Sequence, residues 1–79
     1  MSYFSDPVKN AESVTPSDTT TFTSITHGIY VGGAGDLAVT TVKGNVVTFK
    51  SVPVGLIIPV QASKVMATNT TATDIVRMW

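Results

Sequence analysis

Residues 28–39, Gly28-Ile29-Tyr30-Val31-Gly32-Gly33-Ala34-Gly35-Asp36-Leu37-Ala38-Val39, decide between two folds. An apolar run leads into Gly33-x-Gly35-x-x-Ala38, the spacing of the glycine-rich fingerprint that binds the pyrophosphate of a dinucleotide. That fingerprint requires a helix that begins at its last glycine. Residues 36–42 alternate with β-branched side chains instead, as a strand does, and no acid follows at the distance that the ribose requires. The glycines therefore predict a tight connection between antiparallel strands, without a nucleotide.

The composition also excludes several classes of partner. Charged residues make up only 13% of the 79 residues, about half the usual share for a soluble domain. The five basic and five acidic side chains are scattered singly, so there is no basic stripe for nucleic acid and no polybasic patch for an anionic membrane. With so few charges to solvate the surface, we expect copies of the chain or other proteins to cover part of it.

The length and the lack of cysteine limit the fold further. At 79 residues the chain forms one small domain, roughly half the size that a dinucleotide-binding domain needs. The absence of cysteine excludes disulfides and thiolate metal sites. The longest mostly apolar run, residues 52–60, contains two prolines and a glycine and is about half a membrane span, so we expect no membrane anchor. Oligomerisation is the usual way in which a domain with such a small core and no disulfide or metal gains stability.

From residue 21 onward, short β-branched and aromatic runs are broken by Gly, Pro or Asn about every ten residues. This pattern predicts an all-β domain over residues 21–79, a small antiparallel β-barrel or sandwich of six to seven short strands. Its expected strands are 21–25, 28–31, 37–42, 46–50, 56–61, 64–68 and 74–78. Its expected turn residues are Gly32, Gly33, Gly35, Asp36, Gly44, Asn45 and Gly55.

Residues 1–20 have almost no periodic apolar signal and predict an extended N-terminal arm. Tyr3, Phe4, Val8 and Val14 are the arm side chains that could pack. Two interpretations of this arm remain open. It is either a flexible terminus or an extended segment that lies on a neighbouring subunit with Tyr3 or Phe4 as its anchor.

Two positions of the β-domain are further candidates for contact with partners. Pro59 interrupts an apolar strand, which favours an edge or a bulge, and edge strands invite pairing with another chain. Trp79 ends the last strand, on the same face as Ile75 and Arg77. Its side chain packs either in the core of its own domain or in a pocket of a neighbouring subunit. The candidate partner interface is therefore Tyr3, Phe4, Val8, Val14, Pro59 and Trp79.

The chain offers little to support catalysis. His27 is the one histidine and has no acid within eight residues, the acids are thinly spread, and no serine has a nucleophile-elbow setting. We therefore expect no enzymatic activity, no cofactor and no metal. A carbohydrate-binding or host-surface-binding module is an alternative of another class, in which Tyr30, Phe49 or Trp79 would stack on a sugar ring.

The order of several segments resembles a known family. These segments are Val14-Thr15-Pro16-Ser17-Asp18-Thr19, the run 28–37, Val52-Pro53-Val54-Gly55, Leu56-Ile57-Ile58-Pro59-Val60, the run 65–73, and Ile75-Val76 before an aromatic end. Together they resemble the small head-spike base proteins of gene transfer agents and related tailed bacteriophages. The resemblance runs from about residue 14 to the end, and its most specific piece is Tyr-Val-Gly-Gly-Ala-Gly-Asp-Leu.

The resemblance implies a virion structural protein without catalytic residues. A protein of this family would form a ring of copies on the capsid exterior, with five copies as the candidate size at a fivefold vertex, and would carry a fibre or spike protein on the major capsid protein. A head decoration protein, a tail-fibre adaptor and a tail-tip component have the same composition and stay open as alternatives.

Overall fold

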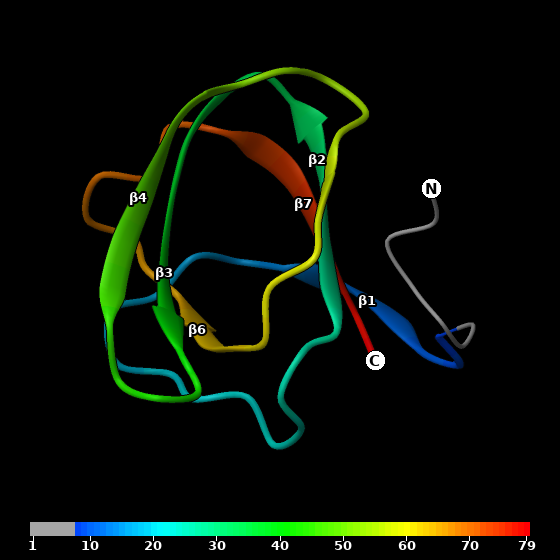
Figure 1. Ribbon diagram of the computed structural model, residues 1–79. Coiled ribbons are helices and arrows are strands. Elements are labelled where there is room, and N and C mark those ends of the chain that lie inside the picture. Colours follow the sequence, from blue (N-terminus) through cyan, green and yellow to red (C-terminus); the bar gives the residue numbers. More distant parts are fainter. Residues whose placement is uncertain (1–7) are drawn as a thin grey trace.

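Residues 8–79, which the computed structural model describes, form seven strands in two antiparallel sheets packed against each other (Figure 1). One sheet has the strand order β1-β7-β2-β5 and the other the order β4-β3-β6. The strands are β1 Ala11–Val14, β2 Gly28–Gly33, β3 Gly35–Thr41, β4 Val46–Val52, β5 Ile57–Ile58, β6 Ala62–Val65 and β7 Thr73–Met78. The predicted all-β class is confirmed, and the architecture is the sandwich rather than the barrel.

The core lies between the two sheets and is built from alternate residues of the central strands. Ile29 and Val31 of β2 and Leu37 and Val39 of β3 have no exposed surface, and Ile75 of β7 lies beside Val31 with 2% exposed. Each such side chain stabilises the fold by roughly 1.5 to 3 kcal/mol through removal from water. The period-two pattern of the sequence therefore specifies the inner face of the central strands, and Ala38 on the other face of β3 is buried as well, with 1% exposed.

The hairpin of β3 and β4 has the turn that its sequence predicts. The N–H of Thr41 donates to the carbonyl of Asn45 at 2.8 Å, and the N–H of Asn45 donates to the Thr41 hydroxyl at 3.2 Å. Gly44 has φ of 94°, a conformation that glycine adopts without steric cost. Gly55, also predicted as a turn residue, has φ of 85° between β4 and β5.

The glycine-rich stretch forms a corner between the sheets rather than a long turn. Gly32 and Gly33, predicted to lie in the turn, belong to β2, and Gly35 and Asp36 belong to β3, so only Ala34 connects the two strands. A Cβ atom added at Gly32 would lie 2.7 Å from the carbonyl oxygen of Asp74, and one at Gly33 would overlap the Thr73 hydroxyl. These two glycines are therefore required by the close approach of β7.

The connection from β6 to β7 crosses between the sheets at the same corner. It runs along β3, where the N–H groups of Thr71 and Ala72 donate to the carbonyl of Asp36 at 2.9 and 3.0 Å, and the N–H of Met66 donates to Ala38 at 2.8 Å. A Cβ atom at Gly35 would lie 2.6 Å from the backbone nitrogen of Ala72. At this end of the sandwich, the backbone at Gly35 therefore packs directly against the backbone of residues 71–72.

The segment between β1 and β2 differs from its prediction. Residues 21–25 have strand-like composition but are not a strand, because they meet β6 through isolated hydrogen bonds rather than a continuous ladder. Residues 11–14, within the predicted arm, form β1, which pairs with β7 along its whole length. Residues 11–14 of the predicted arm therefore belong to a sheet.

Two strand boundaries also differ from the sequence prediction. β5 is two residues long because Pro59 has no N–H and the N–H of Val60 turns back to the carbonyl of Ile58 at 2.9 Å. β6 lies at 62–65 rather than 64–68, because Met66 begins the crossing along β3. The edge position predicted from Pro59 is confirmed, since β5 is the last strand of its sheet.

The corner makes a specific prediction about stability. Gly35→Ala places a Cβ against the backbone of residues 71–72, which cannot move aside as a side-chain end can, so we expect it to lower the free energy of unfolding by about 2 to 4 kcal/mol. Gly44→Ala is the matched control, because its Cβ meets nothing within 4 Å and only the positive φ costs about 1 kcal/mol. Urea unfolding at one fixed protein concentration measures both, and equal losses would contradict the account of the corner.

Candidate assembly surface

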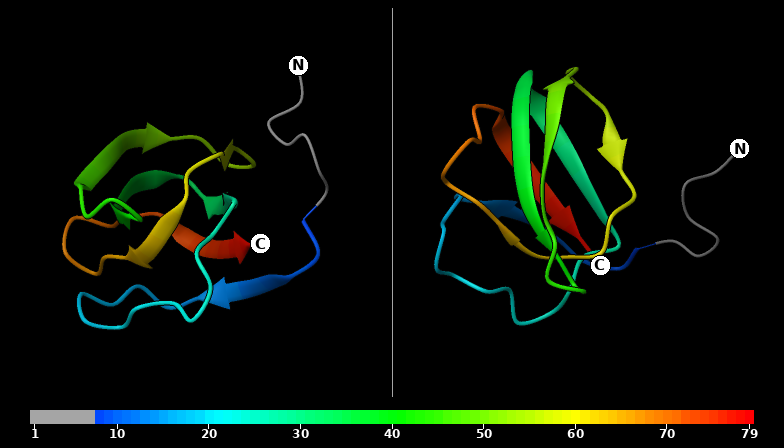
Figure 2. Two further views of the ribbon diagram at one scale, coloured as in Figure 1. Left: turned by 60° about the horizontal axis from the view of Figure 1, so that its bottom comes forward. Right: turned by 60° about the vertical axis from the view of Figure 1, so that its left-hand side comes forward.

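One side of the sandwich is closed by the chain itself. Residues 15–27 leave β1, pass along the outer edge of β6 and return to β2 (Figure 2). On the way the N–H groups of Ser17, Phe22 and Thr26 donate to carbonyls of β6 at 2.9, 2.8 and 3.1 Å. A sheet edge covered in this way cannot accept a strand from another molecule.

Thr26 fixes the end of this covering segment. Its side chain is fully buried, and its hydroxyl donates to the carbonyl of Val60 at 2.7 Å and accepts from the N–H of Ala62 at 3.0 Å. The hydroxyl thus satisfies two backbone groups where β6 begins, which explains a buried threonine in an apolar setting.

Asp18 fixes the middle of the covering segment to the crossing between β6 and β7. Its carboxylate accepts from the Thr68 hydroxyl at 2.7 Å and from the Thr68 N–H at 2.9 Å. These two hydrogen bonds, the hydroxyl first, lower the pKa of Asp18 from the ordinary value of 3.8. The carboxylate stabilises the closed side in its ionised form.

Arg77 closes the end of the core beside the chain terminus. It lies on the inner face of β7 next to Ile29, with its side chain 8% exposed, and donates from Nε and Nη2 to Glu12 of β1 at 3.2 and 2.8 Å. Its guanidinium lies 3.9 Å from the ring centre of Trp79 and 4.7 Å from that of Phe22. Arginine combines ion pairing with stacking in a way that lysine cannot.

The opposite side of the sandwich is open. Between β4 and β5 lies an apolar groove of about 330 Å³. It is lined by Phe49, Lys50, Ser51, Val52, Pro53, Leu56, Ile57, Ile58 and Pro59. In the described part of the chain, neither strand has a backbone partner on the side that faces outward. We call this region, the groove with the free edges of β4 and β5, the open side.

Apolar surface extends from the open side along the β3–β4 hairpin. Val46 is 65% exposed and Val47 39%, both on β4, and Val42 before the turn is 47% exposed. β4 is seven residues long and has no proline, and Lys50 is its one charged residue. Long, mostly apolar edges with a single charge are the kind that soluble monomers normally avoid, so these residues are suited to contact with another protein.

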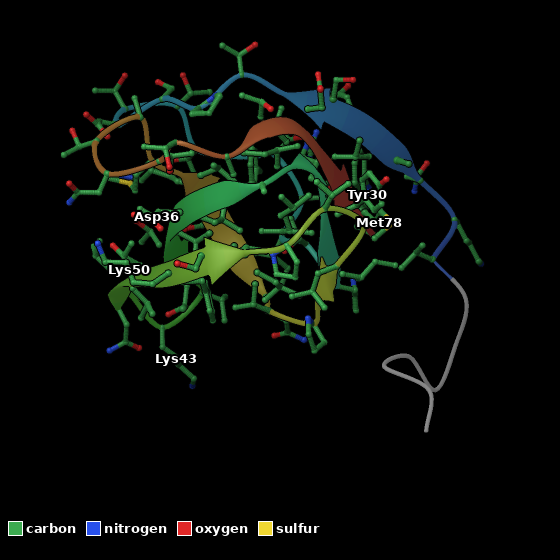
Figure 3. All side chains as sticks on the ribbon, turned by 90° about the horizontal axis from the view of Figure 1, so that it is seen from above. Tyr30, Asp36, Lys43, Lys50 and Met78 are labelled. Atoms are coloured by element: carbon green, nitrogen blue, oxygen red, sulfur yellow. The ribbon has the colours of Figure 1, made fainter. Side chains whose placement is uncertain are left out.

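The rim of the groove carries a charge pair. The Asp36 carboxylate accepts from the Ser51 N–H at 2.9 Å and from Lys50 Nζ at 3.3 Å, and Figure 3 shows the Lys50 and Asp36 side chains next to each other. The Ser51 N–H, together with Lys50, lowers the pKa of Asp36 from 3.8. Since the Lys50 side chain is 76% exposed, its ammonium group is available to a further partner.

The structure separates the residues predicted to form the partner interface. Tyr3 and Phe4 lie outside the described residues. Val14 packs partly against the core of its own domain, and Val8 is half-buried before β1. Pro59 is exposed at the open side, whereas Trp79 is half-buried against Arg77 at the end of β7, an inner strand of its sheet. Among the described members of the set, Pro59 therefore lies at the open side, while Val14 and Trp79 lie elsewhere in the domain.

The residues of the open side that sequence analysis missed belong to β4, to the turn after it and to β5. Phe49, Leu56 and Ile57 line the groove, and Val46 and Val47 extend it. Their apolar character was visible in the sequence, but which face they occupy depends on how β4 and β5 lie in space.

The aromatic residues considered for sugar binding do not share a face. Tyr30 lies on the outer face of its sheet, opposite to Ile29 and Val31. Phe49 lines the groove, and Trp79 stacks on Arg77.

The described residues contain no group of three or more His, Cys, Asp or Glu side chains that could hold a metal ion. His27 is exposed, and its backbone N–H donates to Met78 at 2.7 Å. Within residues 8–79 there is also no helix that is long and apolar enough to cross a membrane.

The chain matches no known family model and no curated protein. Among solved structures, it is similar to a chain of the structure described as the capsid of a native gene transfer agent particle computed with C5 symmetry. The two are 32% identical, the match covers 100% of this chain and 90% of the other, and the TM-score is 0.84. This chain belongs to the capsid-associated proteins of gene transfer agents and phages.

This likeness decides the class of protein. A capsid-associated protein of this kind is a virion structural protein, so its location is the virion and its implied role is not enzymatic. The prediction of a gene transfer agent or phage virion protein is therefore confirmed. The head-spike base role and the ring remain predictions.

We expect the ion pair of Arg77 to matter far more than the exposed pair of Lys50. Arg77→Lys keeps the charge but loses the stacking and the fork of hydrogen bonds to Glu12, so it should lower the free energy of unfolding by about 2 to 3 kcal/mol. Lys50→Gln should change it by less than about 0.5 kcal/mol, because exposed pairs contribute little. Denaturant unfolding compares the two, and a mild effect of Arg77→Lys would contradict the role of this cluster.

The lowered pKa of Asp18 predicts a specific acid sensitivity. A carboxyl group whose pKa is lower in the folded state stabilises the fold above its unfolded pKa, and that stabilisation is lost as the pH falls through the folded value. The urea midpoint of the protein should therefore fall below about pH 4, and Asp18→Asn should make that fall shallower. Asp74→Asn is the control, since no hydrogen bond to the Asp74 side chain is present in the described residues. An unchanged slope in Asp18→Asn would show that the Thr68 contacts do not hold the covering segment.

Proposed function

We propose that this protein is a homo-oligomeric accessory of a gene transfer agent or phage capsid, which forms a ring on the exterior of the head and serves as the base for a spike or fibre. The observation that carries the proposal is the match over the whole chain to a component of a capsid treated with C5 symmetry. A protein at a fivefold vertex is present in multiples of five, and a pentameric ring satisfies that symmetry.

The architecture supports assembly with copies of the same chain. One side of the sandwich is closed by residues 15–27, while the open side has free strand edges and an apolar groove. Rings are built from contacts between two different surfaces of one subunit. An asymmetric domain with one open and one closed side fits that requirement better than a self-complementary dimer does.

The outer faces of the ring would meet the other partners. The major capsid protein lies beneath and the fibre or spike protein above in this proposal. The low charge of the chain favours contacts made by apolar and neutral polar groups, which are relatively insensitive to salt. Its likeness to a head component supports a place on the head rather than on the tail.

Light scattering over a dilution series tests the ring. We expect a particle of about five times the 8.3 kDa mass of the chain that dissociates on dilution, with an apparent stability that rises with protein concentration. Sedimentation with purified heads that lack the protein should then show saturable binding. A monomer at every concentration that also fails to sediment with heads would overturn the proposal.

A further inference from the structure

The groove of the open side is large enough to accept an aromatic side chain. A dry cavity of roughly 150 Å³ binds benzene, and this groove has about 330 Å³. Phe49 and Leu56 form its floor by packing against the core of the domain, while Pro53 and Pro59 on its rim are exposed. An aromatic ring placed there would continue the core of the sandwich outward.

The free edge of β4 lies beside the groove and can accept a strand. β4 is paired with β3 on one side, and no described segment donates or accepts a backbone hydrogen bond on the other. β6, at the far edge of the same sheet, is covered by residues 15–27. A peptide added to β4 would gain backbone hydrogen bonds from the edge and side-chain contacts from the groove, the combination used in strand-addition complexes.

Residues 1–7, Met-Ser-Tyr-Phe-Ser-Asp-Pro, have the chemistry that this site requires. Tyr3 and Phe4 are adjacent, so in an extended chain one ring points into the groove and the other to the outside. Asp6 brings a second carboxylate to the rim where Lys50, 3.3 Å from Asp36, keeps its ammonium group largely exposed. Pro7 follows at the point where the added strand would end.

β1, which follows this segment in the chain, lies at the sheet edge opposite the groove. β1 is at one edge of its sheet and β5, beside the groove, is at the other, with β7 and β2 between them. Residues 9 and 10 continue β1 past the end of the sheet, where their N–H groups donate to the Trp79 carbonyl at 2.9 and 2.7 Å. Seven extended residues span about 23 Å, which is long enough to reach a groove on an adjacent copy. The start of β1 and the acceptor groove lie at opposite edges of one sheet, an arrangement that allows head-to-tail contacts between copies.

We infer that residues 1–7 of one copy bind in the β4–β5 groove of the next copy, adding a strand to β4 and inserting Tyr3 or Phe4 into the hollow. The inference rests on the proposed ring and names the contact that closes it. Each subunit donates one segment and accepts another, so a closed ring leaves no groove of this kind unfilled.

Disulfide trapping tests this contact, because the chain contains no cysteine. The variant Ser5→Cys with Pro53→Cys places one thiol on the segment and one on the groove rim. Mild oxidation should give a ladder of covalent oligomers that ends at the ring size found by light scattering. The matched control, Ser5→Cys with Thr23→Cys, places the second thiol on the closed side and should give no ladder.

Two results would overturn the inference. If the oxidised double variant migrates only as a monomer with both thiols consumed, the segment binds its own groove. If no disulfide forms although light scattering still shows the oligomer, the ring closes through another surface, and the proposed function stands without this contact. A parent protein that forms no oligomer and binds no heads would remove the proposed function itself.

A second variant probes the same contact without cysteines. Tyr3→Ala with Phe4→Ala should raise the concentration at which half of the oligomer dissociates by at least about tenfold, as expected for the loss of buried aromatic anchors. Ile25→Ala, which removes an exposed apolar side chain of the closed side, should leave that concentration unchanged. Equal behaviour of the two variants would contradict the inference.

Discussion

The fold depends on the near contact of two backbone crossings, residues 32–36 and residues 71–74, which pass between the sheets at one corner. The space that a Cβ would fill at Gly35 is taken by the backbone of Ala72, and at Gly32 by that of Asp74. Because backbone meets backbone there, the register of β2 with β7 is coupled to the position of β3. The inner faces of both sheets are thereby aligned, and the core forms between them.

The remaining asymmetry of the molecule follows from where the covering segment runs. Residues 15–27 occupy the edge of β6, held by Thr26 and Asp18, and nothing in the described chain does the same for β4. A small domain with 13% charged residues has little with which to solvate a free apolar edge. Association with copies of the chain and with the capsid removes that apolar edge from water. This connects the composition to a structural role in the virion.

The hairpin, the edge position of Pro59 and the all-β class could be predicted because each depends on local pattern. β1 could not, since Ala11–Val14 has little strand character and becomes a strand through β7 and the pairing of Glu12 with Arg77, 65 residues away. Residues 21–25 have strand propensity, but only the hydrogen bond from the Phe22 N–H to the Ser63 carbonyl joins them to β6. The groove could not be predicted from the sequence for a similar reason, because it exists only where β4 and β5 lie near each other in space. The family resemblance indicated the virion, but not the surface that assembles.

Amide hydrogen exchange, compared between the assembled protein and its dilute monomer, tests most directly whether the open side is the assembly surface. If it is, assembly slows exchange along β4, residues 46–52, and leaves β6, residues 62–65, unchanged because that edge is already covered. Exchange of β4 that is the same in both states, with protection appearing elsewhere on the domain, would contradict this account.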